Sequence, residues 1–246
     1  MKITVIGGTG LIGSQLVSGL RTAGHEVTPS SLSTGVDLLT GAGLDEALAG
    51  AETVVNVTNS PTFDEASPAF FRTSMGHLLA AGERAGVGHQ VILSIVGVDL
   101  VPQLDYYRAK ALQEELLRNG PTPHSIVRAT QFFEFVDAVM SWTSDEHTVR
   151  LPSTHIQPIA AADVVAALAD VATSPPLGGT LDVAGPEVFT LDELGRLTLS
   201  ARQDGRTVVT DEQAGMFAAT DAGVLVAGPG ARLAATRYED WLGAAR

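Results

Sequence analysis

Three residues in the middle of the chain have the side chains and the spacing for proton transfer. Tyr106 and Lys110 are four residues apart and would share one face of a helix, with the phenol beside the ammonium group. A neighbouring cation favours the phenolate, so we expect Lys110 to lower the pKa of Tyr106 toward neutrality. Ser94 ends the preceding apolar run, where its hydroxyl can hydrogen-bond a substrate oxygen as charge develops there. Ser94, Tyr106 and Lys110 are the candidate catalytic residues.

The composition of the chain draws attention to the lysine. Of the fifteen basic residues, thirteen are arginine and only two, Lys2 and Lys110, are lysine. Two of the three tyrosines, at positions 106 and 107, lie within one helical turn of Lys110. The alternative interpretation is an amphipathic helix with a chance pair, in which Lys110 pairs with Glu114 at the next turn.

A glycine-rich turn near the N-terminus predicts a nucleotide site. Residues 3–6 are apolar and indicate a buried strand, and the residues after 13 have the spacing of a helix. Between them, Gly8-x-Gly10-x-x-Gly13 matches the dinucleotide-binding pattern, and the overlapping Gly7-x-x-Gly10-x-x-Gly13 is a variant of it. Glycine lets backbone N–H groups approach a pyrophosphate, and the helix N-terminus adds partial positive charge. An ordinary strand–helix turn is the alternative.

The segment after the second strand predicts which nicotinamide cofactor is bound. An NAD site usually has an acidic residue there to bind the ribose 2′-hydroxyl. Residues 29–34 instead read Pro-Ser-Ser-Leu-Ser-Thr, with four hydroxyls to bond a 2′-phosphate and no carboxylate to repel it. NADP is therefore favoured over NAD, and a solvated serine loop is the alternative. The candidate cofactor-binding residues are Gly7, Thr9, Gly10, Leu11, Ile12, Gly13, Ser30, Ser31, Ser33, Asp37, Leu38, Asn56 and Lys110.

Strands alternate with helices through the first 130 residues, with the spacing of βαβ units. This alternation predicts an α/β fold with a doubly wound parallel sheet, the Rossmann fold. We expect short strands at 36–38, 52–57 and 90–94, and helices at 44–48, 67–85 and 131–142. Thr190-x-x-Glu193 is a capping box that opens a later helix. A single domain is expected, with a nucleotide-binding core of about 1–130 plus 155–173 and a small C-terminal α/β substrate lobe of about 131–154 and 174–246.

Composition excludes several classes of function. The net charge of −13 argues against nucleic acid, whose phosphates would be repelled. The chain has no cysteine, and its six histidines are scattered without metal-ligand spacing, so no metal site is expected. No apolar run is long enough for a membrane span, and the first strand leaves no room for a secretory segment, which predicts a cytoplasmic protein.

These motifs together resemble the short-chain dehydrogenase/reductase superfamily, and most closely its atypical, NmrA-like branch of NAD(P)H-binding proteins. The resemblance rests on the glycine stretch 7–13, on Ser94 and on Tyr106-Tyr107-Arg108-Ala109-Lys110. It extends to Arg128-Ala129-Thr130-Gln131-Phe132 and to Ala184-Gly185-Pro186-Glu187. The resemblance implies that Tyr106 donates a proton, that Lys110 holds the nicotinamide ribose and tunes Tyr106, and that Ser94 orients the substrate carbonyl.

One position departs from the superfamily pattern. An asparagine is often found in the long helix after the fourth strand, and the corresponding residue here is Thr73, which argues against a proton relay through that position. The branch also includes members that lack the tyrosine and sense the cofactor without catalysis. Because this chain has Tyr106, the resemblance favours an enzyme.

The leading hypothesis is an NADPH-dependent reductase that acts on a ketone, quinone or similar polarised double bond of a hydrophobic small molecule. Aromatic side chains that could line its pocket are Phe132, Phe133, Phe135 and Trp142, and at least half of them are expected in the core. The alternatives are a non-catalytic NADP(H)-sensing regulatory protein and an epimerase or lyase with tightly held NAD. The sequence leaves the substrate and the oligomeric state open.

Overall fold

The computed structural model describes residues 1–62, 64–219 and 223–244. Positions 220–222 and 245–246 of the expected substrate lobe therefore lie outside the described residues. The chain forms two compact units. The first consists of Met1–Arg128 and Val164–Leu181, and the second of Ala129–Asp163 and Asp182–Arg246.

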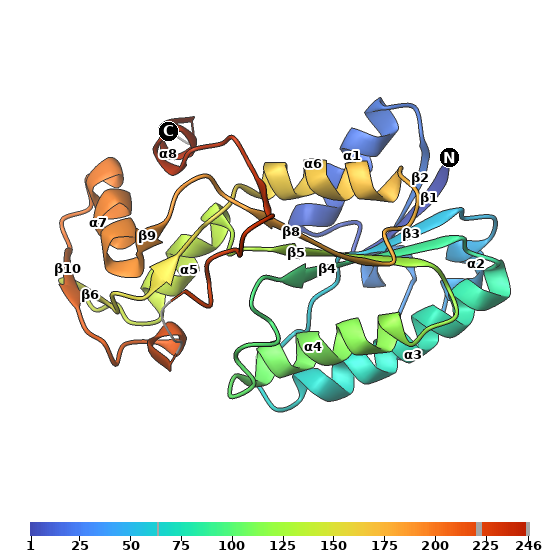
Figure 1. The fold of residues 1–246 in the computed structure, drawn as a ribbon, viewed down its shortest axis with the longest axis horizontal. Helices are drawn as coiled ribbons and strands as arrows, with labels where there is room; N and C mark the ends of the chain where they lie inside the picture. The colour runs from blue at the N-terminus through green and yellow to red at the C-terminus, as the bar shows by residue number, and fades with distance from the viewer. Residues whose placement is uncertain (63, 220–222, 245–246) are drawn as a thin grey trace. The chain divides into compact units, whose positions relative to one another are not determined.

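A parallel seven-stranded sheet with helices on both faces confirms the predicted Rossmann fold (Figure 1). Its strands are β1 (Lys2–Ile6), β2 (Glu26–Ser30), β3 (Thr53–Asn56), β4 (His89–Ile95), β5 (His124–Ala129), β8 (Gly179–Ala184) and β11 (Arg232–Leu233). Their order in the sheet is β11-β8-β5-β4-β3-β1-β2. Because β2, β1, β3 and β4 are parallel neighbours, their carboxyl ends lie at the same edge of the sheet.

The helices beside this sheet are α1 (Leu11–Thr22), α2 (Leu44–Leu48), α3 (Ser67–Ala85), α4 (Asp105–Arg118) and α6 (Ala161–Ala172). Figure 1 shows α3 and α4 on one face of the sheet and α1 and α6 on the other. The predicted helices 44–48 and 67–85 are confirmed residue for residue. Helix α3 has a proline in its first turn, a position that favours the start of a helix. It ends at Gly86, whose φ is 70°.

The strand expected at 36–38 is wrong. Val36 and Leu38 are buried in the core, as a strand would require, but their segment is a loop that follows a short 3₁₀ helix, η1 (Leu32–Thr34). The backbone N–H of Val36 donates to the carbonyl of Ser31, and that of Asp37 donates to the carbonyl of Ala42. Because these donors are used within the loop, the segment does not join the sheet.

The helix expected at 131–142 is shorter than predicted. The chain stays extended to Phe132, which forms a parallel bridge with Ile159, and the N–H of Phe133 donates to the carbonyl of Ile159. A 3₁₀ helix, η2 (Phe133–Phe135), then leads into α5 (Val136–Ser141). Pairing with residue 159 therefore delays the start of the helix.

The second unit contains two small sheets and two further α-helices. Strands β6 (Thr148–Leu151) and β10 (Thr207–Thr210) are parallel, and β7 (His155–Ile156) and β9 (Phe189–Thr190) are antiparallel. A 3₁₀ helix, η3 (Met216–Ala219), precedes α8 (Tyr238–Ala244) in the chain. The predicted capping box is confirmed, because Thr190 and Glu193 cap the start of α7 (Leu191–Arg202) in both directions.

Candidate active site

The glycine turn joins the end of β1 to the start of α1. Gly7 has a φ of 84°, which favours glycine, and the N–H groups of Gly7 and Gly8 donate to the carbonyl of Ser30 at 2.8 and 3.2 Å. The turn is therefore fixed to the carboxyl end of β2, the strand that precedes the serine segment.

Two of the remaining glycines are required by the chain itself, and one is not. A Cβ atom on Gly8 would lie 2.8 Å from the backbone of Pro29, and one on Gly13 would lie 2.1 Å from the carbonyl oxygen of Gly7. At Gly10, however, the nearest atom to a Cβ would be the Gly7 oxygen, at 3.5 Å. Among the described residues, no contact explains the glycine at position 10.

The surface beside Gly10 fits a nucleotide pyrophosphate. Thr9, Gly10 and Leu11 are exposed, whereas Ile12 and Gly13 are buried. The first N–H groups of a helix have no acceptor within the helix. In α1 they directly follow Gly10, where the absence of a Cβ atom leaves space for a phosphate. The residues present therefore fit an NAD(P)H cofactor, with the pyrophosphate at residues 7–13.

The serine segment is partly occupied with its own hydrogen bonds. Ser31 and Thr34 cap η1 reciprocally, and the hydroxyl oxygens of Ser31 and Ser33 are 2.8 Å apart. Ser30 differs, because it is buried and its Oγ has no hydrogen-bond partner in the part of the chain that the structure describes. The solvated-loop interpretation therefore accounts for the Ser31–Thr34 cap but not for Ser30.

Two other candidate cofactor residues, Asp37 and Leu38, form hydrogen bonds within the protein. The carboxylate of Asp37 accepts hydrogen bonds from the N–H of Leu39 and the hydroxyl of Thr40, at 2.8 and 3.0 Å. The carbonyl of Leu38 lies 2.9 Å from the Nδ1 atom of His77. These contacts hold the loop between η1 and α2 in place.

Asn56, at the end of β3, is buried and orders the segment that follows. Its Oδ1 atom accepts hydrogen bonds from the N–H and the hydroxyl of Thr58, at 2.9 and 2.7 Å. Its Nδ2 atom lies 3.6 Å from the sulfur of Met75 on α3. Asn56 therefore connects the carboxyl edge of the sheet to α3.

Lys110 is buried on α4, with 3% of its surface exposed. Its Nζ donates to the carbonyl of Leu93 at 2.7 Å and to the Oε1 atom of Gln113, and it lies 5.1 Å from the ring centre of Phe71. Burial lowers the pKa of Lys110 to about 7, and the negative charge of Glu114 opposes this effect. The amine is therefore close to the point at which it loses its charge at neutral pH.

The alternative pairing of Lys110 with Glu114 is not the arrangement found. The Glu114 carboxylate, itself buried, accepts hydrogen bonds from Arg128 at 2.7 and 2.8 Å and from Arg118 at 2.7 Å. Arg128 also contacts Asp99, in the loop between β4 and α4. Glu114 thus joins α4 to the end of β5, while Lys110 has its own acceptors.

Tyr106 lies in the first turn of α4, and its hydroxyl donates to the Oδ1 atom of Asn59 at 2.6 Å. The expected lowering of its pKa by Lys110 is wrong for this arrangement. Burial raises the pKa of Tyr106 well above its ordinary value, and the hydrogen bond with Asn59 only partly offsets burial. The phenol is therefore protonated at neutral pH.

Ser94 lies near the end of β4 and is buried, and its Oγ has no hydrogen-bond partner among the described residues. The residue before it, Leu93, supplies the carbonyl that accepts from Lys110. The contact of Lys110 with Leu93 thus joins α4 to β4 one residue before Ser94. An unpartnered buried hydroxyl is costly, and a substrate oxygen at this place would satisfy it.

The residue expected at the proton-relay position does not lie in the core. Thr73 is exposed on α3, whereas the next two residues, Ser74 and Met75, are buried. The sequence did not predict the contact of Asn59 with Tyr106 or that of Gln113 with Lys110. Gln113 is three residues after Lys110, a helical spacing that could have identified it, but no local signal places Asn59 beside Tyr106.

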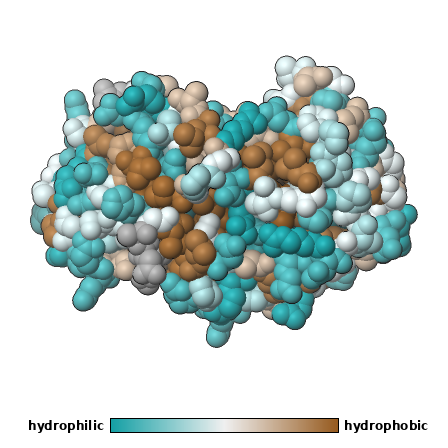
Figure 2. All heavy atoms as spheres, in the orientation of Figure 1, coloured by the Kyte–Doolittle hydropathy of each residue, from teal (hydrophilic) through white to brown (hydrophobic). Residues whose placement is uncertain are grey.

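The aromatic residues of the second unit divide into core and surface. Phe133 is buried against Tyr238, at 4.9 Å between ring centres. Phe135 packs edge-on against Trp142 at 5.4 Å, and Trp142 is 46% exposed. Figure 2 shows apolar residues (brown) at the surface over the part of the chain that holds α5 and α7. Phe133 is therefore a core residue, and Phe135 with Trp142 is the pair available to a ligand.

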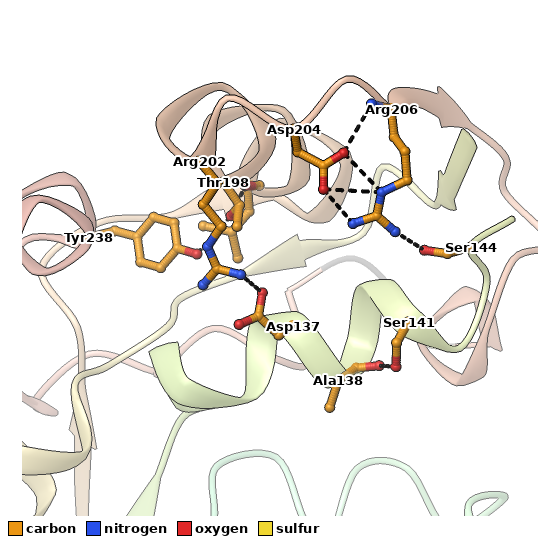
Figure 3. A network of polar contacts seen from close by, with 10 residues as sticks. Asp137, Ala138, Ser141, Ser144, Thr198, Arg202, Asp204, Arg206 and Tyr238 are labelled. Carbon is orange, nitrogen blue, oxygen red and sulfur yellow. Dashed lines mark hydrogen bonds and ion pairs between the residues drawn. The ribbon is translucent and has the colours of Figure 1, made fainter. Parts of the chain in front are cut away.

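Polar contacts join α5, α7 and α8 of the second unit (Figure 3). Asp137 on α5 forms an ion pair with Arg202 at the end of α7. The hydroxyls of Thr198 and Tyr238 are 2.7 Å apart, which joins α7 to α8. The Arg206 guanidinium contacts both Asp204 and Ser144. These contacts fix α5, whose C-terminal end precedes Trp142.

No three histidine, cysteine, aspartate or glutamate side chains in the part of the chain that the structure describes come together as metal ligands. Within residues 1–62, 64–219 and 223–244, no helix combines the length and the hydrophobicity that a membrane span requires.

Comparison with known proteins identifies similar sequences and folds. A family described as NAD(P)H-binding matches residues 7–175. A (4-alkanoyl-5-oxo-2,5-dihydrofuran-3-yl)methyl phosphate reductase of Streptomyces griseus subsp. griseus is 29% identical over 213 residues. That alignment covers 78% of this chain and 70% of the relative.

Two solved structures show the same fold over nearly the whole chain. MoeE5 in complex with UDP-glucuronic acid and NAD has a TM-score of 0.76 and 17% identity, covering 99% of this chain and 97% of that one. An NADPH-dependent quinone oxidoreductase from Escherichia coli has a TM-score of 0.68 and 16% identity, covering 99% of each chain. At these identities the two structures show the fold alone.

Proposed function

Because the chain belongs to the NAD(P)H-binding family, we propose that it is an NADPH-dependent reductase of hydrophobic small molecules. The superfamily resemblance seen in the sequence is confirmed, and an NAD(P)H-dependent oxidoreductase is supported by the family and by the reductase from Streptomyces griseus. The observation that carries the finer proposal is the buried Ser94 hydroxyl, which has no hydrogen-bond partner among the described residues. The carbonyl of the preceding residue, Leu93, accepts a hydrogen bond from Lys110. Lys110 lies on the helix that also holds Tyr106.

We assign each catalytic residue the role that the superfamily resemblance implies. Ser94 would donate a hydrogen bond to the substrate oxygen and orient the double bond that is reduced. Tyr106, protonated at neutral pH, would supply the proton. Lys110 would hold the nicotinamide ribose. When bound, the reduced cofactor supplies the hydride.

The cofactor contacts extend from the glycine turn to the serine segment. Gly10 and the start of α1 would hold the pyrophosphate, and the hydroxyls between Ser30 and Ser33 would bind a 2′-phosphate. The preference for NADP over NAD rests on these hydroxyls and on the absence of a carboxylate in residues 29–34. Comparable affinity for NADPH and NADH in a fluorescence titration would contradict it.

The substrate class is a ketone, a quinone or a similar polarised double bond. The name of the Streptomyces griseus relative describes an unsaturated lactone ring conjugated to carbonyl groups, which belongs to this class. We assign the apolar contacts of the substrate to the predicted substrate lobe of about 131–154 and 174–246, where Phe135 packs against Trp142. The acidic chain without cysteine fits a cytoplasmic enzyme.

The test is an NADPH-oxidation assay with a panel of quinones, ketones and unsaturated lactones. Tyr106→Phe should lower kcat by a factor on the order of 10² or more, because general acid catalysis typically contributes that much. Tyr107→Phe is the matched control, since this neighbouring tyrosine is buried and packs edge-on against Tyr106. Undiminished activity of Tyr106→Phe would contradict the role of proton donor.

The second candidate is a non-catalytic NADP(H)-sensing regulatory protein. The observation that favours it is the hydrogen bond from Tyr106 to Asn59, which directs the phenolic proton to the protein in the absence of ligand. This candidate predicts different affinities for NADP and NADPH and no turnover of any substrate in the panel.

A further inference from the structure

Asn59 contacts the proposed proton donor from a distant part of the chain. It lies three residues after the end of β3, at the carboxyl edge of the sheet, and 47 residues before Tyr106. The 2.6 Å hydrogen bond between Tyr106 and the Asn59 carboxamide therefore joins the β3 edge to the first turn of α4. Open α/β sheets bind ligands at this edge, at the carboxyl ends of their strands.

The hydrogen bonds fix the orientation of this carboxamide. Its Oδ1 atom accepts from the backbone N–H of Ser60 at 2.9 Å as well as from the hydroxyl of Tyr106. Both partners donate to the same atom, so that atom must be the oxygen, because an amide nitrogen would offer them no lone pair. The phenol is consequently the donor, and its proton points at Asn59.

The segment that carries Asn59 is itself anchored. Asn56 is buried and accepts hydrogen bonds from both the N–H and the hydroxyl of Thr58, immediately before Asn59. The loop therefore presents the Asn59 oxygen from a fixed backbone, which a positioning role requires.

We propose that Asn59 is a positioning residue for Tyr106, holding the phenol and its proton at the carboxyl edge of the sheet until substrate binds. This role rests on the proposed function of Tyr106 as proton donor. Asn59 takes up no proton; it restrains the ring through one hydrogen bond, and the substrate oxygen must compete with it for the phenolic hydrogen. Restraint of this kind increases kcat because misplacing a catalytic group slows the reaction.

Nuclear magnetic resonance of the ligand-free protein tests the contact independently of activity. The chain has three tyrosines, so labelling tyrosine with carbon-13 at Cζ gives three signals, and Tyr106→Phe identifies the one from residue 106. Asn59→Leu should shift the Tyr106 signal, whereas Ser60→Ala, which leaves the backbone N–H in place, should not. An unmoved Tyr106 signal in Asn59→Leu would overturn the proposal.

Kinetics then separate positioning from structural support. Asn59→Leu should lower kcat on the order of tenfold and leave the affinity for NADPH unchanged. In the Tyr106→Phe background, the same change should have no further effect, because the restrained group is gone. If Asn59→Leu has the kcat of the wild type while Tyr106→Phe is impaired, the role of Asn59 is wrong and the proposed function stands. Full activity of Tyr106→Phe would instead overturn the proposed function and this role with it.

Discussion

Replacing Lys110 by methionine should change how the stability of this protein depends on pH. Burial lowers the pKa of Lys110 from 10.5 to about 7 in the folded chain. The unfolded chain exposes the amine and restores the higher value, so between these two pKa values the unfolded state binds one proton more than the folded state. The free energy of unfolding therefore rises with pH across this window.

The size of the effect follows from the same two values. One bound proton corresponds to a slope of about 1.4 kcal/mol per pH unit. Between about pH 7.5 and about pH 9.5 the wild type should gain roughly 2–3 kcal/mol relative to Lys110→Met, which has no amine to titrate at this position. Because both proteins share every other titrating group, those contributions cancel in the difference.

Urea unfolding followed by circular dichroism at the two pH values measures this difference. Lys2→Met removes the only other lysine, which is partly exposed beside Glu26, and controls for the loss of one positive charge. If the stability difference between wild type and Lys110→Met is the same at both pH values, the inference that burial perturbs Lys110 is wrong.

Three further predictions concern the glycine turn and the buried polar contacts. Gly13→Ala should cost at least about 2 kcal/mol of stability in urea unfolding, because its Cβ would lie 2.1 Å from a backbone oxygen. Gly10→Ala, with its nearest atom at 3.5 Å, should unfold like the wild type and lose NADPH affinity in a fluorescence titration. Glu114→Gln should lower the free energy of unfolding by about 3–5 kcal/mol, because it leaves the largely buried Arg128 without its carboxylate. Arg118 is the exposed partner of Glu114, and Arg118→Ala should lower the free energy of unfolding by less than about 1 kcal/mol. Met75→Leu keeps the side-chain volume but removes a sulfur that lies 3.6 Å from the amide nitrogen of Asn56 and 3.8 Å from that of Gln113. It should lower the free energy of unfolding in urea by about 1–2 kcal/mol. No measurable loss would show that these sulfur contacts are unimportant.

Local signals in the sequence were sufficient for most elements of the fold. Proline in the first turn and glycine after the last fixed both ends of α3, and the reciprocal Thr190–Glu193 cap fixed the start of α7. Segment 36–38 was different, because its alternating buried residues satisfy a strand pattern while its N–H groups donate to carbonyls of the same loop region, such as that of Ala42. Hydrophobic alternation reports burial of side chains and does not report the partner of the N–H groups.

In the candidate site, the sequence predicted local spacing but not contacts between residues far apart in the chain. The spacing of Tyr106 and Lys110 indicated that they share a helix face, but not which atoms each would contact. Lys110 bonds to the carbonyl of residue 93, and Tyr106 bonds to Asn59, 47 residues earlier. The expected effect of the lysine on the tyrosine failed because the sequence shows charge but does not show desolvation, which dominates both pKa values.

Burial also explains why a chain rich in arginine has a lysine at position 110. The acceptors around Nζ are a carbonyl and a carboxamide, both neutral, so a permanent charge there would be desolvated without a counter-ion. Arginine stays charged in proteins, whereas lysine can lose its proton when buried. Arg128, which is also largely buried, has the Glu114 carboxylate to balance it. The basic residue at each position therefore matches the charge of its acceptor, and Lys110 is the position where a residue that can become neutral is required.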